Sequence, residues 1–167
     1  MSVQKNVASA RKSWVEAMKA AKPHQVTTAP LSVGGVRKGE KLLIPSPQML
    51  DEFIRAIPPG ESRDVAGLRK ALAARFGAEA TCPIATGVQL RTVAEAAYES
   101  LGAGQKLDEI TPFWRIIDET TPVSQRLACG ADFIARRRAQ EGVKPAANDD
   151  DSDEARLARY NSRGLWA

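Results

Sequence analysis

Two neighbouring stretches decide the fold class of this chain: RDVAGLRKALAARFG at residues 63–77 and TGVQLRTVAEAAYESLG at residues 86–102. The first stretch has apolar residues at helical spacing, namely Val65, Leu68, Leu72 and Phe76. Asp64 is a preferred N-cap residue and Gly77 a preferred stop residue. The pattern therefore predicts a short amphipathic helix between them.

The second stretch predicts a longer amphipathic helix. Thr86 and Gln89 have the spacing of a capping box, and Gly102 is the expected stop. The apolar row of this helix is Leu90, Val93, Ala94, Ala97 and Leu101. Two consecutive helices of this kind are typical of a helix-turn-helix.

A small β wing is expected after the helix pair. Residues 113–117, FWRII, have β-type composition, residues 118–122, DETTP, indicate a turn, and residues 123–127, VSQRL, a return strand. A last helix is expected from Ala131 to Gln140, just after Gly130. The predicted fold class is mainly α with a small β wing, a winged helix-turn-helix.

This domain is expected to cover residues 41–143. It opens with a short apolar strand, KLLIP, and then a helix with Ser46 as N-cap and Pro47 at its first position. Before it we expect a basic amphipathic helix in residues 1–22 and a linker in residues 23–40 with three glycines and two prolines. Residues 144–167 have the composition of a disordered tail.

Composition limits the setting. The chain has 167 residues and a net charge of +4, with no apolar run long enough to cross a membrane, so we expect a soluble cytoplasmic protein. Residues 146–167 carry five acidic residues and three arginines, which leaves +6 on the rest. That balance suits a surface that binds polyanions. Cys82, Cys129 and His24 lack the spacing of metal ligands, so we expect no metal site and no cofactor.

Five motifs, in order along the chain, resemble the DNA-binding domain of the O6-alkylguanine-DNA alkyltransferases and their non-catalytic alkyltransferase-like relatives. They are IPPGE at 57–61, DVAGLRKAL at 64–72, RTVAEA at 91–96, TPFWRIID at 111–118 and AQEGV at 139–143. The resemblance covers about half of the chain. It implies duplex DNA as the partner, bound through the second helix, and a nucleoid-associated location.

The resemblance also implies that the chain is not an enzyme. The family's reaction needs a cysteine thiolate, activated by a histidine that a glutamate polarises. Phe113 stands in the place of the cysteine and Trp114 in that of the histidine, while Glu141 matches the glutamate and Val65 replaces a tyrosine. These four residues would form a degenerate lesion pocket. Phe113 and Trp114 could equally be core residues.

Arg91 matches the family's arginine finger, which enters the base stack from the minor groove. The DNA-contacting residues expected from the resemblance are Gln89, Arg91, Thr92, Arg115, Arg136 and Arg137. Two of them have structural alternatives, because Arg91 could pair with Glu95 one turn later and Arg115 could brace backbone carbonyls.

The predicted function is therefore non-catalytic binding of duplex DNA, with sensing of alkylated guanine as an extension. Two alternatives stay open. The fold could serve as a protein-interaction module, with a partner bound by the N-terminal helix or the C-terminal tail. It could also be an alkyltransferase that uses Cys82 or Cys129 as an atypical acceptor.

Overall fold

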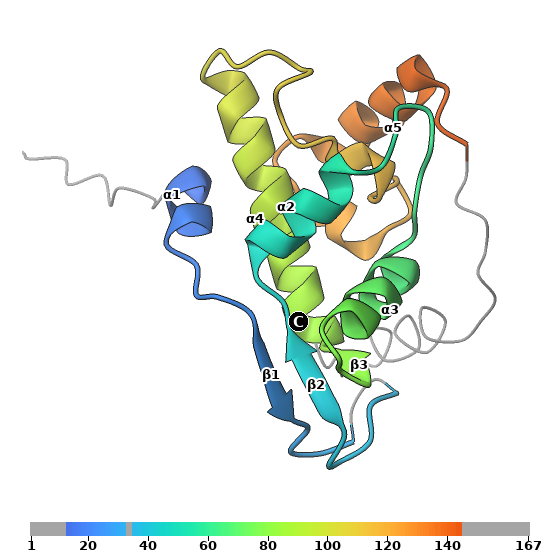
Figure 1. Cartoon of the computed structure of the whole chain (residues 1–167). Helices are drawn as coiled ribbons and strands as arrows, with labels where there is room; N and C mark the ends of the chain where they lie inside the picture. The colour runs from blue at the N-terminus through green and yellow to red at the C-terminus, as the bar shows by residue number, and fades with distance from the viewer. Residues whose placement is uncertain (1–12, 33–34, 145–167) are drawn as a thin grey trace, which may run out of the picture.

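The computed structural model describes residues 13–32 and 35–144 (Figure 1). In chain order the elements are α1 (Trp14–Lys19), β1 (Gln25–Thr28), β2 (Lys41–Ile44), α2 (Pro47–Arg55), α3 (Val65–Arg75), β3 (Ala80–Thr81), α4 (Pro83–Gly102), the 3-10 helices η1 (Phe113–Arg115) and η2 (Pro122–Arg126), and α5 (Gly130–Glu141). The described part is thus mainly helical with one small sheet.

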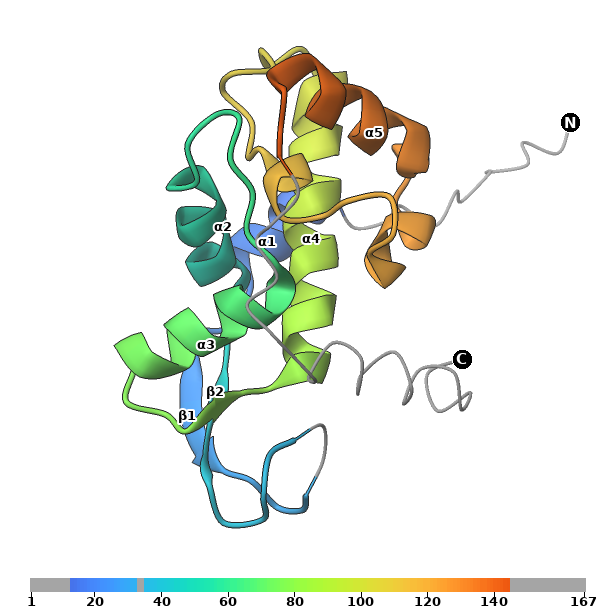
Figure 2. The ribbon, with the colours of Figure 1, turned by 90° about the vertical axis from the view of Figure 1, so that its right-hand side faces the viewer.

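The sheet has the strand order β1-β2-β3. β1 runs antiparallel to β2, with Val26 opposite Leu43, and β3 runs parallel to β2, with Thr81 also opposite Leu43. β3 lies between α3 and α4 in the chain, so its pairing ties the β1–β2 hairpin to the helix pair. The hairpin, β3 and the start of α4 consequently occupy one end of the molecule (Figures 1 and 2).

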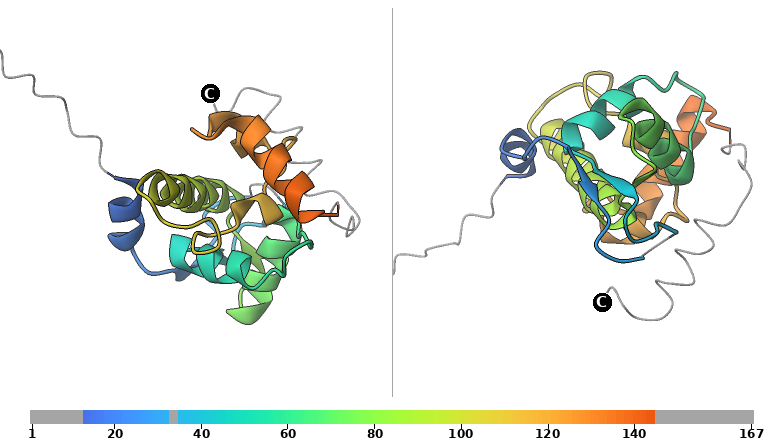
Figure 3. Two further views of the ribbon diagram at one scale, coloured as in Figure 1. Left: turned by 90° about the horizontal axis from the view of Figure 1, so that it is seen from above. Right: turned by 60° about the horizontal axis from the view of Figure 1, so that its bottom comes forward.

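The core is built around α4. α2 and α3 lie on one side of this helix and α5 on the other (Figure 2), while α1 lies at the edge farthest from α5 (Figure 3). The largest side chains that are fully enclosed are Trp114, Phe113, Leu43, Leu50, Ile54, Leu68, Leu90, Ile117 and Ile134. They come from β2, α2, α3, α4, α5 and the η1 region, which explains why the short sheet and the helices form one domain.

Most predicted helix boundaries are confirmed. Ser46 accepts a hydrogen bond from the Met49 N–H and Pro47 is the first residue of α2. The Asp64 carboxylate accepts one from the Gly67 N–H at 2.6 Å, so it caps α3. α4 ends at Gly102, and α5 contains the helix expected between residues 131 and 140.

The predicted linker is wrong, because residues 23–40 contain β1 and a loop that packs on the sheet. All four residues of β1 are exposed, so its sequence shows no alternation of apolar and polar residues. Backbone pairing with β2 holds the strand in place. Ala29 and Val36 in the following loop are buried against Leu42 of β2.

The predicted position of the wing is wrong, since residues 113–117 and 123–127 form no strands. In a strand, Phe113 and Trp114 would point to opposite faces. Both rings are buried in the same core, which the tight turn of η1 allows, with the Ile116 N–H donating to the Phe113 carbonyl at 3.2 Å. The sheet is formed instead by segments that precede α2 and α4.

Two other predicted boundaries shift. α4 begins at Pro83, three residues before the predicted start, because proline suits the first position of a helix. Thr86 is therefore inside the helix, where its hydroxyl donates to the Cys82 carbonyl at 2.7 Å. The N-terminal helix spans Trp14–Lys19 in the described part, and residues 1–12 lie outside the described residues, as does the tail predicted at residues 144–167 except for Lys144. Among residues 13–32 and 35–144, no helix has the length and apolar character needed to cross a membrane.

Candidate functional site

The predicted lesion-pocket residues lie in or against the core. Phe113 is 0% and Trp114 1% exposed. Their ring centroids are 5.5 Å apart, and both rings also pack against Phe133 of α5. Val65, at the start of α3, is half-buried against the same cluster. Phe113 and Trp114 therefore occupy space as core side chains, consistent with the structural alternative for these rings.

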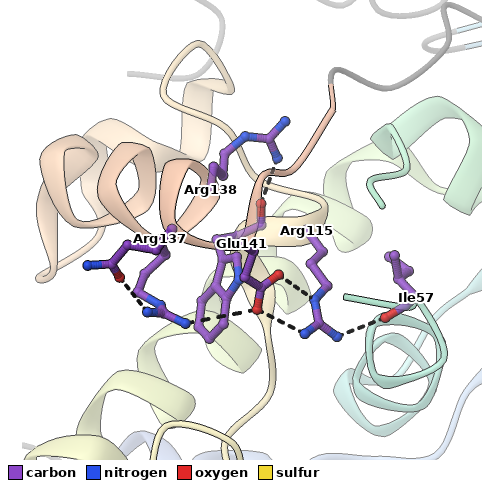
Figure 4. Close-up of polar contacts among 7 residues, drawn as sticks. Ile57, Arg115, Arg137, Arg138 and Glu141 are labelled. Atoms are coloured by element: carbon purple, nitrogen blue, oxygen red, sulfur yellow. Dashed lines mark hydrogen bonds and ion pairs between the residues drawn. The ribbon is translucent and has the colours of Figure 1, made fainter. Parts of the chain in front are cut away.

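Glu141, the fourth of these residues, is paired with Arg115 (Figure 4). Arg115 Nε donates to Glu141 Oε2 at 3.0 Å and Nη2 donates to Oε1 at 2.9 Å. Its remaining nitrogen, Nη1, donates to the Ile57 carbonyl at 2.8 Å. The two side chains are only 12% and 13% exposed, so this ion pair ties η1 to the end of α5 and to the chain after α2.

The charge state of Glu141 follows from this pairing. Burial raises the pKa of the carboxyl, but the hydrogen bonds from Arg115 and the nearby charge of Arg137 outweigh burial and hold the pKa below its usual value. Glu141 is therefore an anion that is already satisfied within the fold. It is a poor candidate for a general base.

The three arginines of α5 differ in accessibility. Arg137 lies over the Trp114 ring, 4.9 Å from its centroid, and donates to Gln140 Oε1 at 2.5 Å. Arg138 Nη1 donates to the Trp114 carbonyl at 2.6 Å. Figure 4 shows both side chains directed toward the η1 region. Arg136 is the exposed member of the three.

Arg91 lies on the middle of α4 under α1. Its guanidinium is 5.4 Å from the centroid of the Trp14 ring. Glu99, two turns further along α4, accepts hydrogen bonds from the Ser13 hydroxyl and from the Trp14 N–H, the latter at 2.9 Å, and so fixes the start of α1. Glu95, the expected partner of Arg91, is buried and accepts from the Ala128 N–H at 2.9 Å.

A pocket of about 620 Å³ separates α1, the Arg91 face of α4 and the end of η2. The other two residues of α4 that are predicted to contact DNA are also poorly exposed to solvent. Thr92 is 9% exposed and its hydroxyl donates to the Val88 carbonyl, while Gln89 is half-buried. The structure therefore does not bring the six predicted DNA contacts together on one accessible face.

Five exposed cations lie elsewhere, around the β1–β2 hairpin and α3. We call this group the basic end: Arg37, Lys38, Lys41, Lys70 and Arg75. All five are exposed, and none makes an ion pair with another residue in the described ranges. The hairpin and the C-terminal end of α3 lie at the same end of the molecule in both side views (Figures 1 and 2).

Acidic groups at the basic end are bound to the backbone. Glu40 accepts from the Arg37 N–H at 2.9 Å, and Glu79 accepts from the Lys41 N–H at 2.6 Å. The start of α4 adjoins this region through β3, and its first turns expose Ile84 (39%) and Val88 (59%). Sequence reasoning missed the basic end because the hairpin was interpreted as a linker.

The two cysteines are separate and neither is in a disulfide. Cys82 is the half-buried residue before α4, and Cys129 is the half-buried residue before α5. Burial raises the pKa of the Cys129 thiol to about 11, with a further contribution from Glu95. Across the described residues, no three His, Cys, Asp or Glu side chains are grouped to hold a metal ion.

No protein-family model, curated protein or solved structure matches the chain.

Proposed function

We propose that the protein binds duplex DNA without catalysis, on a winged helix-turn-helix domain of the alkyltransferase-like type. The observation that carries the proposal is the basic end, whose five exposed cations lie on the hairpin and α3, toward the end of the molecule where α4 begins (Figures 1 and 2). α3 and α4, joined by residues 76–82, act as the helix pair. The β1–β2 hairpin beside them takes the role of the wing.

The chemistry of the basic end suits a phosphate backbone. Lysine and arginine side chains that have no ion-pair partner in the protein can each replace a condensed counterion on DNA, which gives affinity without sequence information. The first turn of α4 adds unpaired backbone N–H groups, since Cys82 supplies no side-chain cap. Ile84 and Val88 would contribute apolar contacts next to the phosphates.

We propose that the protein is not catalytic because of the residue at the position of the family's reactive cysteine. Phe113 fills the core where the family has its cysteine, and no side chain with nucleophilic chemistry takes its place there. A pKa of about 11 leaves little thiolate on Cys129 at neutral pH, which argues against an atypical acceptor at that position. Because Phe113 and Trp114 fill the core, we expect no preference for duplex that contains alkylated guanine.

Fluorescence anisotropy with a labelled duplex, with and without one O6-methylguanine, tests the proposal. Binding should weaken with salt with a log-log slope near −4.5, the value for about five phosphate contacts, and equally for both duplexes. Arg37→Ala/Lys38→Ala should lower the magnitude of the slope by about two, one unit per lost contact. Lys106→Ala, an exposed cation beyond the other end of α4, is the matched control and should leave the slope unchanged.

Mass spectrometry of the protein after incubation with the modified duplex completes the test. The mass should stay that of the unmodified chain. A gain of one methyl group on Cys82 or Cys129 would show an alkyltransferase, and no binding of either duplex at low salt would exclude a DNA-binding function.

A protein-interaction function is supported by a different observation. β1 is an edge strand in the described sheet, all four of its residues are exposed, and it contains no charged residue. Such an edge can accept a strand from a partner by β-augmentation. A partner bound in this way would be held mainly by backbone hydrogen bonds, so its affinity would show little dependence on salt.

A further inference from the structure

We propose that the acidic run DDDSDE at residues 149–154 binds the basic end of its own chain and competes there with DNA. This inference rests on the proposed function of the basic end as a polyanion-binding surface. Three features carry it: the place where the chain leaves the described domain, the length of α3, and the distribution of charge.

The chain leaves the described domain beside the start of α3. The Lys144 carbonyl accepts a hydrogen bond from the Ser62 hydroxyl at 2.6 Å, and the Lys144 N–H donates to the Gly60 carbonyl at 3.3 Å. Ser62 is two residues before Asp64, the N-cap of α3. Lys144 therefore lies near the N-terminal end of α3, with Lys70 and Arg75 further along the same helix.

The distance to be covered matches the chain available. α3 has 11 residues and so is about 16 Å long. The segment from Lys144 to Asp149 has five Cα–Cα steps, which span at most about 18 Å. Because Lys144 is bonded a few residues before the start of α3, Asp149 can reach Lys70, about half-way along the helix, and the five residues after Asp149 can reach Arg75 and continue toward the hairpin.

Charge favours the far end of α3 over the near end. Residues 149–154 hold five carboxylates, and the basic end holds five cations without ion-pair partners among the described residues. At the near end, Glu61 pairs with Arg63 at 3.1 Å and the Asp64 carboxylate is used as a cap. Residues 145–148, PAAN, carry no charge.

The short connection also makes the contact favourable. A covalently attached segment of this length is present at an effective concentration in the millimolar range, so weak ion pairs are sufficient to populate the contact. Exposed Arg136 on α5 offers a second position for the acidic run, but as one cation with paired neighbours it binds fewer carboxylates.

The first arm of the test needs no DNA. We would compare backbone amide chemical shifts of the full chain with those of a full chain carrying Asp149→Asn, Asp150→Asn, Asp151→Asn, Asp153→Asn and Glu154→Gln. At low salt the two should differ at residues 37–41 and 70–75, and the differences should vanish in high salt. Unchanged amides in both ranges, or changes confined to the region around Arg136, would overturn the proposal.

The second arm measures DNA affinity. At low salt the neutralised chain should bind duplex about ten-fold more tightly than the parent, with a smaller difference as salt rises. In a chain that also carries Lys70→Ala/Arg75→Ala, neutralising the acidic run should change the affinity much less, which controls for net charge. Equal affinity of the neutralised chain and the parent would overturn the competition.

The two arms separate this inference from the proposed function. Amide shifts at the basic end together with no DNA binding by either chain would support the contact and reject DNA binding. DNA binding with no such shifts would support the function and reject the contact.

Discussion

Arginines on the α5 side of the molecule and cations of the basic end are used in opposite ways. Around α5, Arg115, Arg137 and Arg138 bind a carboxylate, an indole ring and backbone carbonyls of the same domain. At the basic end, the cations extend into solvent with no ion-pair partner in the described part of the chain. One group stabilises the fold, and the other is available to an external anion.

The difference shows why a count of basic residues is a weak guide to a binding surface. The resemblance implies DNA contacts for Arg115, Arg136 and Arg137, yet Arg136 is the one of these that is exposed. A buried arginine with satisfied hydrogen bonds contributes little field outside the protein, while an exposed one without a partner contributes fully. Substitutions in the two groups should therefore affect different measurements.

The largest effect on stability is expected for Arg115→Met. The substitution removes the two hydrogen bonds that Arg115 donates to Glu141 and the one that it donates to the Ile57 carbonyl, and leaves Arg137, 3.9 Å from Glu141 Oε1, as the remaining ion-pair partner. Removing one partner of a largely buried ion pair costs about 3–5 kcal/mol of the free energy of unfolding. Urea denaturation followed by circular dichroism measures this loss.

Arg136→Met is the matched control, because Arg136 is exposed on α5, and it should change the free energy of unfolding by less than about 0.5 kcal/mol. Arg115→Met/Glu141→Leu should recover much of the lost stability, since it also removes the carboxylate that has lost its Arg115 donor. Similar stability of Arg115→Met and Arg136→Met would break the distinction between the two groups.

A smaller change in the free energy of unfolding is expected at low pH. The pKa of Glu141 is lowered in the folded protein, so the carboxylate contributes stability above its unfolded pKa of about 4.3 and loses it as the pH falls through the folded pKa. Glu141→Gln should be less stable than the parent at pH 7, and the difference should shrink on the acid side of pH 4. A constant difference between pH 7 and pH 3 would contradict this account of the ion pair.

The smallest effect is expected for Arg91→Ala. Arg91 packs over Trp14, so its loss should lower the free energy of unfolding by about 0.5–1 kcal/mol. Duplex affinity should equal that of the parent, because Arg91 lies outside the basic end. An affinity loss of about 1–3 kcal/mol would instead support the arginine-finger role implied by the resemblance.

Local signals in the sequence predicted the helices well. Ser46 with Pro47, Asp64 and Gly102 mark boundaries through short-range hydrogen bonds or backbone preferences, and each acts at its predicted place. β1 could not be predicted in this way, because an exposed edge strand has no apolar alternation and depends on residues of a partner strand that lie 13 to 19 positions further along the chain. The FWRII segment has the composition of a strand, but the burial of both rings selects a 3-10 turn.

The candidate site was less predictable than the fold. Arg115 and Glu141 are 26 residues apart in the chain, and Arg115 and Ile57 are 58 apart. No spacing rule connects such residues, so sequence alone could not tell an internal arginine from an accessible one. The cations of the basic end come from the hairpin loop, β2 and α3, which the pairing of β3 with β2 brings to the same end of the molecule.

The most direct test of the DNA-binding account compares Arg37→Ala/Lys38→Ala/Lys70→Ala/Arg75→Ala with Arg136→Ala in a salt titration of duplex binding. The account predicts that the free energy of unfolding of the quadruple variant stays within about 1 kcal/mol of the parent's. The magnitude of its log-log salt slope should decrease by about four units, one per lost phosphate contact. Arg136→Ala should keep the slope of the parent. If the quadruple variant binds duplex with the affinity and salt slope of the parent, the assignment of the basic end as the DNA-binding surface is contradicted.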